Sequence, residues 1–267
     1  MSFSRVGAIV LRQFYLIRAN MSRVLPLFIW VAVDIVLWGF LTRYLNTVAL
    51  PGFNFVPALL GAVLLWDFFI RIMQGVTMAF FEDVWARNFL NIFSTPISIR
   101  EYLTGLVFCS VATSSVGIAV MLLIAVSVFG LPFLSYGLLV LPFLLVLFMF
   151  GIALGIAASA LVLRLGPAAE WFIWPIPAII SPFAGVLYPI AVLPKWMQFI
   201  SRLLPPSYVF ESLRDIVSGR AVSGMGLLLS LGLALLYILL ACLFFSLTYK
   251  HATRIGLIAR YSAESLS

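Results

Sequence analysis

The residue types that most often carry enzyme chemistry are scarce in this chain. The sole histidine, His251, follows the last apolar segment, so no Ser–His or Cys–His nucleophilic pair is available inside the apolar part. A histidine-based metal cluster is excluded for the same reason. The two cysteines, Cys109 and Cys242, lie in apolar runs without ligand spacing. No G-x-x-x-x-G-K-[ST] phosphate loop occurs either, so we expect no catalytic residue, no cofactor site and no metal site on this chain.

Three ionisable residues interrupt long apolar runs. Asp34 lies between Trp30 and Trp38 at four-residue spacing, so the three share one helical face. Asp67 and Arg71 have the same spacing and can neutralise one another. Ionisable groups in such segments are the default functional candidates. Three interpretations stay open: a structural ion pair, a transport route, and a membrane enzyme built on the two carboxylates.

The composition indicates that lipid, and not water, surrounds most of the chain. Of its 267 residues, 64% are hydrophobic and 9% are charged, and the mean hydropathy is +1.19. Ordinary soluble domains are roughly a quarter charged, so too few charges exist to cover a water-exposed surface. The excess of 16 Lys and Arg over 9 Asp and Glu fits the orientation of a membrane protein better than binding to nucleic acid.

The apolar runs predict an all-α membrane protein with six transmembrane helices in residues 24–267. A spanning helix needs about 20 apolar residues. The fifth span should be kinked or broken at Pro175, Pro177 and Pro182, and Gly151-x-x-x-Gly155 in the fourth predicts close helix packing. The expected spans are Leu25–Tyr44, Val56–Phe81, Tyr102–Phe129, Phe133–Leu163, Ala168–Leu187 and Met225–Tyr249.

Shorter amphipathic segments flank these spans. Residues 1–23 predict an interface helix, with an apolar stripe that is mostly free of its arginines. The stripe consists of Val6, Val10, Phe14, Ile17 and Met21. Between the fifth and sixth spans, about residues 194–220 predict two short re-entrant helices, each too short to cross a bilayer. Pro194 precedes the first, Pro205-Pro206 stops it, and Ser207 is expected to cap the second.

The polar segment after the second span predicts a partner-binding site. A short helix from Val84 to Phe93 would place three aromatic side chains on one face, surrounded by polar groups, and Ser98 with Glu101 forms a capping box for the third span. A helix resting on the membrane surface is the alternative to a docking helix for a cytosolic partner. The docking residues would be Glu82, Asp83, Trp85, Arg87, Asn88, Phe89 and Phe93.

The distribution of Lys and Arg predicts the orientation. With six spans and the N-terminus inside, roughly ten of these residues face the cytosol and roughly five face outward. The inverted arrangement would reverse the ratio. We therefore expect a multi-pass protein of the cell (inner, cytoplasmic) membrane with both termini in the cytosol.

Two stretches of the sequence resemble the permeases of type-2 ATP-binding-cassette exporters. One combines the acidic pair after the second span with Ser94-Thr95-Pro96 and Ile99-Arg100-Glu101-Tyr102; the other is LYPIAVLPKWMQFISRLLPPSYVFESLRDI, from Leu187 to Ile216. The resemblance implies a permease dimer, most simply a homodimer, in the lipid bilayer with separate ATPase subunits that bind ATP and Mg. It also implies a coupling helix at about residues 82–95 that docks on the ATPase.

The resemblance further implies a route for an amphipathic, lipid-like, drug-like or lipid-linked substrate that is moved outward. The residues on or near this route would be Trp30, Asp34, Trp38, Asp67, Arg71, Trp171, Trp174 and Phe183. An ion-coupled secondary transporter that uses Asp34, Asp67 and Arg71 as a relay is the alternative function.

Overall fold

The computed structural model describes residues 1–19, 21–48, 55–86 and 88–256, and no β-strand occurs among them. The predicted all-α class is confirmed. The long helices are α1 (Phe3–Ala19), α2 (Met21–Val48), α3 (Gly61–Trp85), α5 (Ile99–Phe129), α6 (Val140–Leu165) and α11 (Gly224–Arg254). The shorter helices are α4 (Phe89–Phe93), α7 (Glu170–Ile173), α8 (Ile176–Ala184), α9 (Lys195–Leu203) and α10 (Pro205–Val217). Short 3₁₀ or π-helical segments are η1 (Val56–Leu60), η2 (Phe133–Leu139), η3 (Gly166–Ala169) and η4 (Ile190–Val192).

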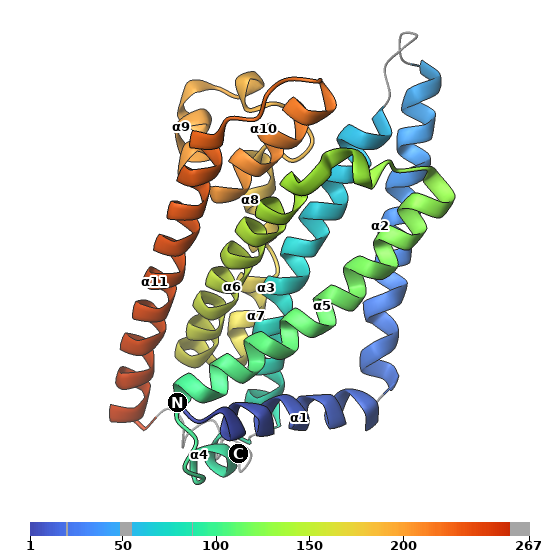
Figure 1. The fold of residues 1–267 in the computed structure, drawn as a ribbon. Coiled ribbons are helices and arrows are strands. Elements are labelled where there is room, and N and C mark those ends of the chain that lie inside the picture. Colours follow the sequence, from blue (N-terminus) through green and yellow to red (C-terminus); the bar gives the residue numbers. More distant parts are fainter. Residues whose placement is uncertain (20, 49–54, 87, 257–267) are drawn as a thin grey trace.

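The long helices form a bundle around α3 and α6. Helix α6 packs against α3 and α11, and α5 packs against α3 and α2. Helix α1 lies across one end of this bundle, where α4 is also found, and α9 and α10 lie at the opposite end (Figure 1). The two ends of the bundle therefore carry different helices, and they would lie at the two different surfaces of a membrane.

Four helices in the described residues are long and apolar enough to cross a membrane. They span Val56–Trp85, Ile99–Phe129, Tyr136–Leu165 and Gly224–Arg254, and they coincide with the predicted second, third, fourth and sixth spans. The predicted first span corresponds to α2, and the predicted fifth to the shorter pair α7 and α8. That these two segments also cross the bilayer stays a prediction.

The small residues of the fourth span lie at a close helix contact, as their spacing predicts. A Cβ atom added to Gly151 would meet Ile72 of α3 at 3.0 Å, and one added to Gly155 would meet the carbonyl oxygen of Met73 at 2.9 Å. Contacts this short leave no room for a larger side chain. The Gly151–Gly155 pair therefore allows α3 and α6 to approach one another closely.

The helix ends follow the proline and capping signals with one exception. Ser98 and Glu101 form the predicted capping box at the start of α5, and the chain between Ile173 and Ile176 breaks the fifth apolar segment into α7 and α8. Helix α9 starts after Pro194 as expected. Ser207 does not cap α10, because the helix already begins at Pro205, where a missing N–H costs nothing.

Helix α1 packs on the bundle through a stripe that shares Val6 with the predicted apolar stripe. Val6, Ile9 and Gln13 are its buried residues, whereas Phe14 is exposed. In the contact with α5, the side chain of Ile9 fills the space above Gly105. One side of α1 thus packs on the bundle and a second apolar side stays open; its position relative to a bilayer stays a prediction.

Candidate functional site

The polar segment after the second span is built differently from the predicted single helix. Helix α3 continues to Trp85, the backbone turns at Ala86, and a separate helix α4 starts at Phe89. The predicted helix from Val84 to Phe93 is therefore wrong, because its first two residues form the last turn of α3. Arg87 and the side chain of Phe89 lie outside the described residues.

A buried carboxylate joins three elements at the end of α3. Asp83 is 1% exposed, and its Oδ2 accepts hydrogen bonds from Nη1 of Arg12 in α1 at 2.9 Å and from the Tyr102 hydroxyl in α5 at 2.6 Å. Nη2 of Arg12 donates to the other oxygen, Oδ1. The hydrogen bonds that Arg12 donates to Asp83 raise the pKa of the Arg12 guanidinium above its ordinary value. We name this cluster of Arg12, Asp83 and Tyr102 the α1–α3–α5 junction.

A second carboxylate ties the start of α1 to the start of α5. Glu101 accepts hydrogen bonds from the backbone N–H of Ser98 at 3.0 Å and of Ser2 at 2.7 Å. Nη1 of Arg5 lies 3.6 Å from the same carboxylate. The two helices that flank α4 along the chain, α3 and α5, are therefore both attached to α1 by paired charges.

The aromatic residues of this segment do not share one exposed face. The Phe93 ring packs inward, 5.7 Å from the ring of Tyr102 and 6.1 Å from that of Tyr249. Trp85 is 45% exposed, while Glu82 and Asn88 are half-buried, and Asn88 accepts a hydrogen bond from the Asn91 side chain. Four of the exposed side chains at this end of the bundle define a surface, which we name the α4 surface: Trp85, Asn91, Ser94 and Thr95.

The three predicted intramembrane charges come together. Nε of Arg71 donates to Oδ2 of Asp67 at 2.6 Å within α3. Asp34 of α2 interacts electrostatically with both of these residues, and the Arg71 side chain lies against Gly117 of α5. Asp34 and Asp67 are thus both within electrostatic range of one guanidinium, and the three groups carry one negative charge in excess when both carboxylates are ionised.

A hollow of about 470 Å³ lies beside these charges, between α3 and α8. Trp66, Ile70 and Gln74 line it from α3 at four-residue spacing. Trp66 and Ile70 directly precede Asp67 and Arg71 in the sequence. The apolar and the charged side chains therefore leave α3 in different directions and contact different neighbours. The remaining lining residues are Trp174, Pro177, Ala178, Ser181 and Pro182. The hollow is mostly apolar and has an amide and a hydroxyl group at its wall.

Comparison with known proteins identifies the family. A family model described as "ABC-2 type transporter" matches residues 5–218. This range includes the α1–α3–α5 junction, the Asp34, Asp67 and Arg71 cluster, and the short helices α9 and α10. The chain belongs to the ABC-2 type transporter family. No match was found among curated proteins. Members of this family are the membrane components of ATP-binding-cassette transporters; they are not themselves catalytic and work with an ATP-binding-cassette ATPase. By its family, the chain is a transporter permease.

Family membership and the apolar helices make the permease a multi-pass membrane protein. They do not favour the ion-coupled alternative. Within the described part of the permease, no three His, Cys, Asp or Glu side chains lie close enough together to hold a metal ion.

The remaining residues of the predicted route lie on several elements of the permease and differ in exposure. Trp171 is 84% exposed, and Trp30 is also exposed, whereas Trp38 is half-buried against the core. Phe183 packs on Trp196 of α9, with ring centroids 6.3 Å apart. Only Trp174 of the predicted aromatic residues lines the hollow. The sequence prediction missed Trp66, Ile70 and Gln74, although their four-residue spacing in an apolar run was a visible signal.

Proposed function

We propose that this permease is half of an exporter that moves an amphipathic, lipid-like, drug-like or lipid-linked molecule out of the cell. Membership of the ABC-2 type transporter family supports the transport function. The outward direction is an inference from the resemblance of its two sequence blocks to type-2 exporters. The observation that carries the mechanism is the α1–α3–α5 junction directly beside α4.

The proposed ATPase docks on the α4 surface. This surface lies at the end of the bundle that holds α1 (Figure 1), and it combines an exposed tryptophan with polar side chains. Exposed aromatic residues amid polar groups are typical of protein interfaces. Because Asp83 binds both Arg12 and Tyr102, a displacement of α4 would move the ends of α1, α3 and α5 together. In this proposal ATP and Mg²⁺ bind to the ATPase, and the junction transmits the closure of the ATPase dimer to the membrane helices.

The proposed substrate route passes along α3. The hollow between α3 and α8 offers two tryptophan rings for apolar contact and the polar groups of Gln74 and Ser181 for orientation. On the adjacent stripe, the Asp34, Asp67 and Arg71 cluster joins α2 and α5 to the same helix. We propose that a second permease copy completes the route, that the junction end faces the cytosol, and that α9 and α10 dip into the outer leaflet.

Docking can be tested by purifying the tagged permease together with its ATPase from a co-expressing strain. Trp85→Ala combined with Asn91→Lys should lose most of the bound ATPase and leave membrane insertion unchanged. Leu138→Ala is the control, because this 84% exposed residue lies in η2, at the far end of α5 from α4. Full ATPase recovery with the double variant would refute the α4 surface as the docking site.

A further inference from the structure

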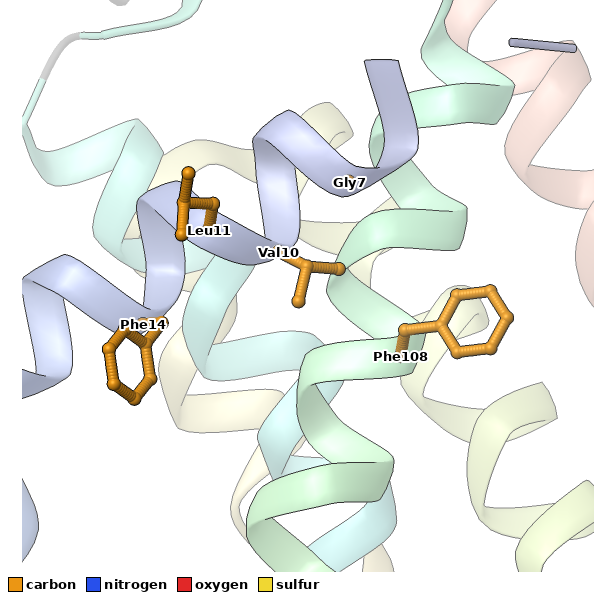
Figure 2. A pocket seen from close by; sticks show the side chains of 5 residues that line it. All are labelled: Gly7, Val10, Leu11, Phe14 and Phe108. Atoms are coloured by element: carbon orange, nitrogen blue, oxygen red, sulfur yellow. The ribbon is translucent and has the colours of Figure 1, made fainter. Parts of the chain in front are cut away.

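A second hollow, of about 520 Å³, lies between α1 and α5 and shares no lining residue with the hollow of the proposed substrate route. Its lining residues are Gly7, Val10, Leu11, Phe14 and Phe108 (Figure 2). The four α1 residues have the spacing i, i+3, i+4 and i+7, so they form one stripe of that helix. All the lining side chains are apolar, and Gly7, which has none, deepens the hollow.

This stripe differs from the stripe that holds α1 on the protein. Val6, Ile9 and Gln13 face the bundle, while Leu11 and Phe14 are more than half exposed. Phe108, which contributes the wall from α5, is also exposed and lies nine residues after Ile99. At 1.5 Å per residue it is about 14 Å along the helix from the start of that span. Phe108 thus lies within the apolar helix Ile99–Phe129, which is long enough to cross a membrane, and an exposed side chain in such a helix contacts lipid chains.

The charge beside the hollow identifies the class of lipid. Helix α1 carries three arginines and no acidic residue. Arg5 and Arg12 are paired with Glu101 and Asp83, whereas the exposed Arg18 has no ion pair among the residues that the structure describes. Arg18 follows Phe14 by four positions and Leu11 by seven, which places it on the same stripe, one turn beyond the hollow. A guanidinium in this position favours a negatively charged headgroup over a zwitterionic one.

We propose that the hollow between α1 and α5 binds one acyl chain of an anionic membrane phospholipid, and that Arg18 pairs with the net negative charge of its headgroup. The apolar lining supplies the affinity for the chain, and the arginine selects the headgroup. Since Arg12 attaches the opposite side of α1 to Asp83, the bound lipid also holds the junction at a fixed depth in the bilayer. This site is separate from the docking and transport roles proposed above and does not depend on them.

The test is a lipid titration of the purified full-length permease in detergent, followed by native mass spectrometry, with phosphatidylglycerol and phosphatidylcholine as probes. The variant Gly7→Leu fills the hollow from inside, because a Cβ added there meets no atom within 4 Å. We expect it to weaken phosphatidylglycerol binding about tenfold, the effect of losing roughly two methylene contacts. The matched control is Gly232→Leu in α11, where an added Cβ also meets nothing within 4 Å; it should bind lipid as the parent does.

The variant Arg18→Gln tests the headgroup contact without changing the packed side of α1. We expect the preference for phosphatidylglycerol over phosphatidylcholine to fall by roughly fivefold, with little change in binding of the zwitterionic lipid. Unchanged phosphatidylglycerol binding by Gly7→Leu would overturn the site. A Gly7→Leu variant that changes its oligomeric state and still binds the lipid would also overturn it, because a second copy of the chain would then be what covers the hollow. An unchanged headgroup preference in Arg18→Gln would overturn the role of the arginine.

Discussion

The guanidinium of Arg12 meets both carboxylate oxygens of Asp83 across 71 positions of the chain, at the point where α3 ends. A planar guanidinium and a carboxylate are matched for two parallel hydrogen bonds, which gives this contact a fixed geometry as well as charge. The Tyr102 hydroxyl donates to the same carboxylate. The end of α3 is thus held from two sides, and α4 starts from a rigid base.

Removal of the arginine should destabilise the permease and uncouple it. Arg12→Ala leaves the buried Asp83 carboxylate with one fewer charged partner, so we expect a loss of about 3 kcal/mol in the free energy of unfolding. Denaturation in mixed micelles measures this loss, and ATPase activity of the reconstituted complex measures the coupling. Lys250→Ala, an exposed cation in α11, is the control and should change stability by less than about 0.5 kcal/mol. Stability equal to that of Lys250→Ala would contradict the junction.

The intramembrane charges should differ in their structural importance. Arg71→Ala removes the guanidinium that is paired with Asp67 and leaves Asp34 and Asp67 within electrostatic range of one another, so we expect a loss of about 3 kcal/mol and poor assembly. Asp34→Asn keeps the Asp67–Arg71 contact of 2.6 Å intact, so the protein should still elute as the parent species while transport changes. Size-exclusion chromatography and a transport assay in proteoliposomes separate these results. Aggregation of Asp34→Asn would mean that Asp34 is a structural residue.

Local signals predicted most helix boundaries because they act through neighbouring residues. The Ser98–Glu101 capping box and Pro194 lie where the sequence indicates, and both depend on contacts within one turn. The prediction failed at Val84 and Trp85, which continue α3. Helix α3 continues past Asp83 to Trp85, and Asp83 binds Arg12, which lies 71 residues earlier in the sequence. A local sequence pattern contains no information on a contact between residues so far apart.

The candidate site was predictable only in part for the same reason. The four-residue spacing of Asp67 and Arg71 predicts their contact, since both lie on one helix. The approach of Asp34 from α2 and the wall that Ser181 adds to the hollow depend on how separate helices pack. Phe93 shows the limit most clearly, because its aromatic character suggested docking while its ring packs inward on Tyr102.

Filling the hollow between α3 and α8 should block transport without unfolding the protein. Ala178 lines this hollow, whereas the neighbouring Ile179 is 62% exposed and does not line it. Ala178→Trp should therefore reduce substrate-stimulated ATPase activity and transport by at least about tenfold, whereas Ile179→Trp should leave both near the parent values. Equal transport by the two variants would exclude the hollow from the route. The thermal unfolding temperature of each variant shows that the fold is retained.

The contact between α3 and α6 should not tolerate a methyl group. A Cβ at Gly155 would lie 2.9 Å from the Met73 carbonyl oxygen, so Gly155→Ala should cost about 1–3 kcal/mol through displacement of the helices. The same change at Gly232 of α11 meets no atom within 4 Å and should stabilise the helix by up to about 1 kcal/mol. Opposite signs of the two changes in free energy of unfolding are the expected result. A stabilised Gly155→Ala would show that the two helices are further apart.

The buried side chain of Gln13 provides a way to stabilise α1. Gln13 is 3% exposed on the side of α1 that faces the bundle, and its Nε2 finds no hydrogen-bond partner among the described residues. A buried donor without a partner costs about 1–3 kcal/mol. Gln13→Met keeps a similar length and removes the donor, so the free energy of unfolding should rise by about 1 kcal/mol or more, whereas Gln13→Ala, which leaves a cavity, should not gain as much. Destabilisation by Gln13→Met would contradict this prediction and show that the amide makes a favourable polar contact in the folded permease.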